Sequence, residues 1–205
     1  MSTAKYIQSK IFFLGNSLMN SNTNGAVSNG FYIPMTVYDN VTQIPKIYAL
    51  NCNCVPGQKT ATIYANINTG AIAEARAGDV VVLWEITNDC VTEATTGQIA
   101  YNNIMDIVTV LKTQRGCKFV VCTGIARDGA SDAADLLTKI QDCNALIRTN
   151  SANFDAVCDL GADAMFNTRS DCANTTNYQD DKIHLRLAGQ NNVISLITAS
   201  ITPIL

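Results

Sequence analysis

Residues Lys10–Met19 read KIFFLGNSLM, a short apolar run that ends in Gly-Asn-Ser. A run of this length closed by a turn signal predicts a buried parallel strand. Gly15 allows a sharp turn at the end of the strand, and Asn16 and Ser17 are residue types that cap a following helix. Ser17 would then lie at the carboxyl end of the first strand, where open α/β sheets bind their ligands. Its hydroxyl is either a plain helix cap or, if a base reaches it, a nucleophile.

The rest of the chain alternates strand patterns with helix patterns. Residues 80–86 read VVVLWEI, the clearest strand, because three consecutive β-branched residues open it. Residues 99–112 carry apolar side chains at helical spacing. Strands are also predicted at 46–53, 118–123 and 154–160. Helices are predicted at 31–41, 60–67 and 185–201, and a further helix is expected to be capped by Ser131 and to run through residue 147. The alternation predicts an α/β protein whose parallel sheet is covered on both faces, and we expect one domain over residues 1–205.

The composition narrows the classes of function. The 205 residues are 47% hydrophobic and 15% charged, and the net charge is −3. Because no basic surface is expected, nucleic acid is not an expected partner. No apolar run approaches the length of a membrane-spanning helix, and the first ten residues lack the apolar core of a signal peptide. The oligomeric state and the location stay open, including the hypothesis that the chain is a module of a larger extracellular or virion-associated protein.

Eight cysteines invite a metal or disulfide hypothesis. The sequence has no Cys-x-x-Cys motif and a single histidine, so a zinc site is only weakly supported. Four cysteines lie in apolar contexts and are interpreted as small buried hydrophobes: Cys117, Cys122, Cys143 and Cys158. The other four lie at predicted loop ends, where disulfides are open but not required: Cys52, Cys54, Cys90 and Cys172.

Polar residues of catalytic type lie where the predicted topology would gather them. Ser17 follows the first strand, Asn88 follows the third, and Asp181 and His184 precede the last helix. An imidazole can accept the proton of a serine hydroxyl, and a carboxylate can hold the other nitrogen of that imidazole. His184 is the only histidine, so it is the only candidate base of such a triad. A capping aspartate beside a structural histidine is the plainer interpretation of the same motif.

Four short blocks together resemble the GDSL-type, or SGNH, hydrolases. Residues 15–18 read GNSL, similar to the Gly-Asp-Ser-Leu block that names the family, and residues 56–60 read PGQKT, similar to its second block. Residues 86–89 read ITND, where the family normally has Gly-x-Asn-Asp, and residues 181–185 read DKIHL, similar to its Asp-x-x-His-Leu block. The four blocks occur in the family's order. The resemblance implies a three-layer α/β/α sandwich with a flavodoxin-like five-stranded parallel sheet.

The resemblance also implies roles for individual residues. Ser17 would be the nucleophile of a serine esterase, His184 its general base and then acid, and Asp181 the partner that orients His184. The oxyanion hole would consist of the backbone N–H groups of Ser17 and Gly57 and the side-chain amide of Asn88. Such a mechanism needs no metal and no organic cofactor.

The chain departs from the family pattern at two positions. Asn16 replaces the usual aspartate, which leaves the serine in place. Ile86 replaces the glycine of the third block, and this larger side chain puts the placement of Asn88 in question. Met19 stands where the nucleophile elbow of the α/β-hydrolases would require glycine, which argues against that fold.

The expected substrate is a small-molecule or glycan ester with a short acyl group, acetyl above all. The loops 20–29 and 167–180 are rich in Asn, Thr and Asp, and they lack the apolar cluster that a fatty-acyl tunnel needs. Tyr101 and Tyr178 are candidates to stack on a sugar, as is Trp84, although a core position explains Trp84 better. Two alternatives stay open: a lipase or thioesterase acting on longer acyl chains, and a weakly active or inactive polysaccharide-binding module on the same fold.

Overall fold

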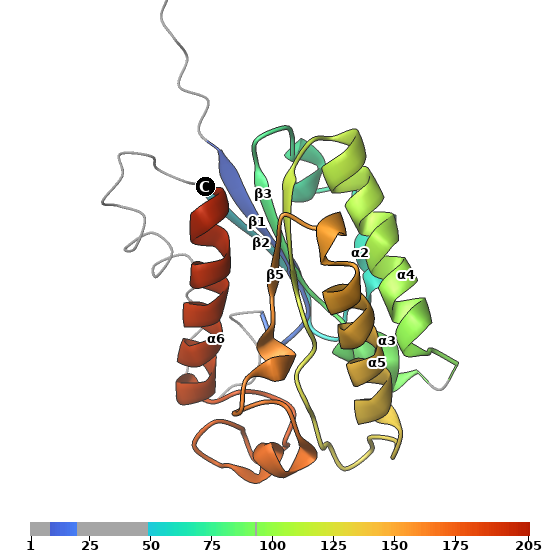
Figure 1. Cartoon of the computed structure of the whole chain (residues 1–205), viewed down its shortest axis with the longest axis vertical. Coiled ribbons are helices and arrows are strands. Elements are labelled where there is room, and N and C mark those ends of the chain that lie inside the picture. Colours follow the sequence, from blue (N-terminus) through green and yellow to red (C-terminus); the bar gives the residue numbers. More distant parts are fainter. Residues whose placement is uncertain (1–8, 20–48, 93) are drawn as a thin grey trace, which may run out of the picture.

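Five parallel strands form the centre of the molecule (Figure 1). The computed structural model describes residues 9–19, 49–92 and 94–205. The strands are β1 (Lys10–Gly15), β2 (Ala49–Cys54), β3 (Val80–Trp84), β4 (Lys118–Cys122) and β5 (Ala156–Cys158), in the spatial order β2-β1-β3-β4-β5. All four neighbouring pairs are parallel. The order reverses after β1, so the carboxyl ends of β1 and β3 flank the place where such sheets bind ligands.

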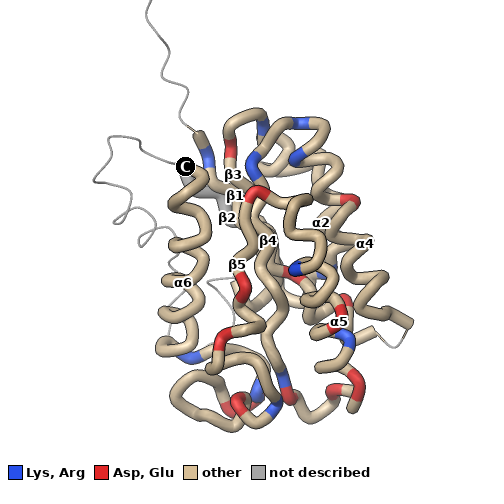
Figure 2. The backbone as a smooth tube through the Cα atoms, in the orientation of Figure 1, with Lys and Arg blue, Asp and Glu red and all other residues tan. Residues whose placement is uncertain are grey.

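The central strands are apolar because both of their faces are covered. Every residue of β3 is buried, as are the residues of β1 and β4 after their first lysine. In Figure 2 the strands are accordingly free of charge along most of their length, and the charged residues gather beyond the strand ends. A run of apolar side chains on both faces is what a parallel sheet between two helical layers requires.

Helices form the two outer layers. The helices are α2 (Thr60–Ala65), α3 (Thr87–Val91), α4 (Gly97–Val108), α5 (Leu136–Thr149) and α6 (Leu187–Ile201). Side chains of α2, α4 and α5 pack with one face of the sheet, and side chains of α6 pack with the other. Figure 1 shows α6 on one side of the strands and α4 and α5 on the opposite side. Short 3₁₀ helices lie at Ala71–Glu74, Ser151–Asn153, Leu160–Ala162, Arg169–Ala173 and Thr202–Ile204, and a π-helical segment, Thr109–Gln114, extends α4.

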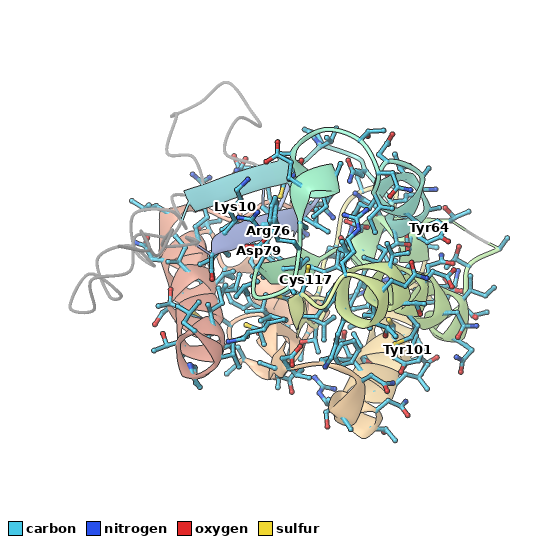
Figure 3. The ribbon with its side chains drawn as sticks, turned by 90° about the horizontal axis from the view of Figure 1, so that it is seen from above. Lys10, Tyr64, Arg76, Asp79, Tyr101 and Cys117 are labelled. Carbon is cyan, nitrogen blue, oxygen red and sulfur yellow. The ribbon has the colours of Figure 1, made fainter. Side chains whose placement is uncertain are left out.

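A buried acidic side chain binds backbone N–H groups at the end of the sheet where the strands begin. Asp79 directly precedes β3, is 1% exposed, and accepts the backbone N–H groups of Lys10 at 2.8 Å and Arg76 at 3.0 Å. Cys117 donates its thiol to the carbonyl of Arg76 at 3.4 Å. Figure 3 labels these four residues where they gather at the starts of the strands. This end of β3 is the one remote from the Ser17 turn.

The expected α/β sandwich is confirmed, with differences at the ends of elements. The prediction that Ser131 caps a helix is wrong, because α5 begins at Leu136 after Asp135 and residues 130–134 form turns and irregular chain. The third strand ends at Trp84, and the short helix α3 that follows it was not predicted. The helix expected at 31–41, the loop expected at 20–29 and the start of the second expected strand lie outside the described residues.

Candidate active site

Ser17, His184 and Asp181 form a continuous chain of hydrogen bonds. His184 Nε2 lies 2.9 Å from Ser17 Oγ, and His184 Nδ1 lies 2.6 Å from Asp181 Oδ2. These hydrogen bonds thus join Ser17 to a segment that lies 167 residues later in the sequence. With the proton on Nδ1, the ring donates to the carboxylate and leaves Nε2 free to accept the serine proton. The three residues expected to form a triad therefore lie in the order and at the distances that proton transfer needs.

Local turn chemistry holds Ser17 at the end of β1. Asn16 Oδ1 accepts the backbone N–H of Leu18 at 2.8 Å, and the carbonyl of Asn16 accepts the N–H of Met19 at 3.1 Å. Asn16 thus supports a turn around Ser17, and any helix capped by it would continue outside the described residues. A Cβ at Gly15 would lie 2.8 Å from the carbonyl oxygen of Trp84, so the close approach of β1 to β3 requires glycine there.

A tight turn presents Asp181 and His184 together. Asp181 Oδ1 accepts the backbone N–H groups of Ile183 at 2.9 Å and His184 at 3.0 Å, while Oδ2 faces the imidazole. The intervening Lys182 has a φ of 57°, in the left-handed region. Partial burial acts to raise the pKa of Asp181, but the hydrogen bonds from the His184 ring and the two backbone groups outweigh it and hold that pKa below its ordinary value. The carboxylate therefore stays charged beside the imidazole.

The two remaining expected donors lie in adjoining segments. Asn88 is the second residue of α3, and its Nδ2 donates to the carbonyl of Gln58, the residue after Gly57, at 3.1 Å. Gly57 has a φ of 72°, and a Cβ there would meet nothing within 4 Å, so its backbone conformation is what favours glycine. The N–H of Val55 in turn donates to the carbonyl of Gly15 at 3.1 Å. An amide NH₂ group has two hydrogens, and among the described residues Gln58 binds one of those of Asn88.

Ile86, the departure that put Asn88 in question, packs into the core. It is 1% exposed and belongs to the apolar cluster on the α4 and α5 face. A Cβ at Gly124 would lie 3.3 Å from the Cβ of Ile86 and 2.8 Å from Cγ2 of Ile140. The small residue at 124 therefore leaves room for the isoleucine side chain in the apolar core.

Buried acids beside Asn88 were missed by sequence reasoning. Asp89 is 3% exposed and accepts both the backbone N–H of Thr60, at 3.0 Å, and the hydroxyl of Thr60. Glu85 is 1% exposed, and its Oε1 accepts the backbone N–H of Asn88 at 3.0 Å while Oε2 accepts from the side-chain amide of Asn16. Burial, followed by the nearby charge of Asp89, raises the pKa of Glu85 well above its ordinary value. An acid at the end of the apolar run VVVLW was the signal that could have identified Glu85.

The aromatic residues suggested for sugar stacking are all in the core. Trp84 is 1% exposed, Tyr101 7% and Tyr178 0%. Tyr178 donates its hydroxyl to the carbonyl of Ala126 at 3.0 Å and packs edge-on against Phe166. The suggestion is therefore wrong for Tyr101 and Tyr178, and the core interpretation of Trp84 is correct.

The cysteines whose side chains are described are all buried. The predicted burial holds for Cys117, Cys122, Cys143 and Cys158. Cys54, Cys90 and Cys172 are buried as well. Cys54 ends β2, as a loop-end position requires, whereas Cys90 lies in α3 and Cys172 in the 3₁₀ helix Arg169–Ala173, so the loop-end interpretation is wrong for these two. The side chain of Cys52 lies outside the described part of the chain. Within that part, no group of three or more His, Cys, Asp or Glu residues could hold a metal ion, and no helix is long and apolar enough to cross a membrane.

Solved structures of esterases and acylhydrolases share the fold along nearly the whole chain. A GDSL-like lipase from Parabacteroides merdae superposes with a TM-score of 0.73 at 15% sequence identity, covering 97% of both chains. An acetyl xylan esterase has a TM-score of 0.68 at 18% identity, covering 93% of this chain and 98% of its own. A mutant acetyl-xylooligosaccharide esterase from Geobacillus has a TM-score of 0.69 at 12% identity, covering 94% of both chains. No family model and no curated protein sequence matches the chain.

Proposed function

We propose that this chain, which has the fold of the SGNH hydrolases, is a serine esterase that acts on short acyl esters. The observation that carries the proposal is the chain of hydrogen bonds from Ser17 through His184 to Asp181. Serine, imidazole and carboxylate in this order are the elements of nucleophilic acyl transfer. They lie at the carboxyl end of the sheet, where this type of fold binds its ligands.

The reaction would proceed through an acyl-enzyme. Ser17 Oγ attacks the ester carbonyl while its proton passes to His184 Nε2, and the imidazolium is stabilised by Asp181. Collapse of the tetrahedral intermediate breaks the ester C–O bond, and the same proton goes to the departing alkoxide oxygen. Water then repeats the sequence: it loses a proton to His184 and attacks the acyl carbon, and Ser17 leaves with that proton as the carboxylic acid is released.

The negative charge of the tetrahedral intermediate would be stabilised by Ser17, Gly57 and Asn88. The first two would donate backbone N–H groups, and Asn88 would donate the amide hydrogen that does not bind Gln58. Anchoring of the Asn88 side chain on the neighbouring segment supports this role, because a donor held in place needs no reorganisation during the reaction.

Replacing Asn88 with alanine should reduce kcat by roughly 10²- to 10³-fold, the usual cost of one lost oxyanion donor. Steady-state hydrolysis of p-nitrophenyl acetate measures the effect, with KM little changed because the donor acts in the transition state. Asn102→Ala is the matched control, since Asn102 is exposed on α4 and accepts from the Gln98 side chain at 2.8 Å. A kcat for Asn88→Ala within about threefold of the control would show that Asn88 does not donate to the oxyanion.

A carbohydrate acetyl ester is the substrate class that we favour. Two of the structurally similar proteins are described as esterases of acetylated xylan or its oligosaccharides. The segment that precedes Asp181 exposes polar side chains, among them Asn174, Thr175, Thr176 and Asp180, and hydroxyl-rich alcohols bind well to such surfaces. Longer acyl chains are the second candidate, because exposed Val55 and Val91 flank the segments that carry Gly57 and Asn88.

Two measurements on the purified protein test the proposal. A fluorophosphonate should add one phosphonyl group to the peptide that contains Ser17, and mass spectrometry of the digest locates it. Heat-denatured protein should not react, because the hydroxyl is activated only in the folded site. The absence of both labelling and ester hydrolysis would refute the esterase and favour the binding module. A series of p-nitrophenyl esters from acetyl to decanoyl decides the substrate class: a steep fall after butyryl supports the acetyl ester, and a rise supports the longer chain.

A further inference from the structure

Two buried acids flank β3, one at each end, and only one of them touches the candidate active site. Asp79 precedes the strand and binds backbone N–H groups of Lys10 and Arg76, at the end that Figure 3 labels. Glu85 follows the strand and binds the Asn16 side chain and the Asn88 backbone. Burying a carboxyl group lowers the stability of the fold unless the group is hydrogen-bonded, so each of the two acids is expected to fix the positions of its hydrogen-bond donors.

We propose that Glu85 is a positioning residue for the esterase reaction: it joins the turn that carries Ser17 to the helix that carries Asn88. This inference rests on the proposed function. Oε2 of Glu85 accepts from the amide of Asn16, whose own oxygen holds the Leu18 N–H and thereby the Ser17 turn. Oε1 accepts the backbone N–H of Asn88 at 3.0 Å. The buried carboxyl group of Glu85 therefore helps to set the distance between the nucleophile and an oxyanion donor.

The same contacts explain why residue 16 is asparagine in this chain. The family block that GNSL resembles has aspartate at this position. Here an aspartate would place a second carboxyl group in direct contact with Glu85 in a buried site, so one of the two groups would have to hold a proton to avoid the repulsion of two like charges. Asn16 provides one oxygen for Leu18 and one NH₂ group for Glu85, and its Nδ2 also lies 3.3 Å from Thr87 Oγ1. Asn16 and Glu85 thus form a matched donor and acceptor.

Exchanging donor and acceptor between the two positions tests the inference. In Glu85→Gln, the amide NH₂ must face a donor, either Asn16 or the Asn88 N–H. In Asn16→Asp, two carboxyl groups meet. In the double variant, the glutamine oxygen can accept from Asn88, the glutamine NH₂ can donate to the new aspartate, and the second aspartate oxygen can still accept from Leu18. The hydroxyl of Thr87, which accepts from Asn16 in the wild type, would donate to the new aspartate, so each hydrogen bond of the original arrangement then has a counterpart.

Each single variant should lower kcat on p-nitrophenyl acetate by about 10- to 100-fold with KM nearly unchanged, and the double variant should recover to within about threefold of the wild type. The unfolding temperatures of the wild type, the two single variants and the double variant should show the same pattern. Each single variant should unfold at a lower temperature than the double variant. Asp79→Asn is the matched control: it changes the buried acid at the other end of β3, so it should lower the unfolding temperature while kcat of the folded protein stays the same.

The possible outcomes separate this inference from the proposed function. If wild-type protein neither hydrolyses esters nor reacts with a fluorophosphonate, the proposed function fails, and the positioning role fails with it. If the wild type is active and Glu85→Gln retains its kcat, the positioning role is wrong while the esterase stands. Failure of the double variant to recover either kcat or unfolding temperature would show that Asn16 and Glu85 do not act as a pair.

Discussion

Replacing Ser17 with alanine is expected to abolish ester hydrolysis, with a loss in kcat on the order of 10⁴- to 10⁶-fold. The hydroxyl is the atom that would form the acyl bond, and it lies 2.9 Å from His184 Nε2, the base that would take its proton. Without it, neither the acyl-enzyme nor the proton transfer can occur. Hydrolysis of p-nitrophenyl acetate by freshly purified protein, corrected for the rate in buffer, measures the loss.

The controls make this result specific to one hydroxyl. Ser131→Ala changes an exposed serine in the loop before α5, so activity should stay at the wild-type level. His184→Ala should cost about as much as Ser17→Ala, and the double variant little more, because residues that act as a unit are not additive. If Ser17→Ala kept a tenth of the wild-type kcat, another group would be the nucleophile, and the proposed mechanism would be wrong.

The sequence predicts the sheet well because the strands are buried on both faces. A fully apolar segment such as Val80–Trp84 has few alternatives to a central parallel strand, and alternation with amphipathic helices then sets the architecture. The meeting of Ser17 with His184 follows from the same topology, since strand ends and the loop before the last helix share one edge of the sheet. The structures similar at 12 to 18% identity share the fold, and the proposed roles of Ser17 and His184 rest on their hydrogen bonds.

Local patterns fail where a tertiary partner decides the outcome. Ser131 has the residue type of a cap, yet α5 begins five residues later. Tyr178 has a polar end that suggests a binding surface, but Ala126 and Phe166 bury it. Glu85 is of a residue type that favours the surface, and hydrogen bonds from Asn16 and from the Asn88 backbone make its burial tolerable. Contacts between segments about 70 residues apart cannot be read from periodicity.

Asp181→Asn should lower kcat by about 10⁴-fold while the fold stays intact. Oδ1 of Asp181 accepts the backbone N–H groups of Ile183 and His184, so the amide oxygen of the asparagine must occupy this place. Its NH₂ group is then directed at His184 Nδ1, where the carboxylate oxygen was. The ring proton must move to Nε2, the nitrogen that faces Ser17, and the imidazole can no longer accept the serine proton.

The neighbouring carboxylate provides the control for this variant. Asp180 is 88% exposed and pairs with Arg186 at 2.8 Å, so Asp180→Asn should leave kcat unchanged. Because the folded pKa of Asp181 lies below its ordinary 3.8, its carboxylate stabilises the wild type above that pH, and this contribution is lost as the pH falls. The unfolding temperatures of wild type and Asp181→Asn should therefore converge in acid. An Asp181→Asn protein that kept a tenth of the wild-type kcat near neutral pH would show that His184 does not depend on Asp181 for its tautomer, and the triad would reduce to a Ser17–His184 pair.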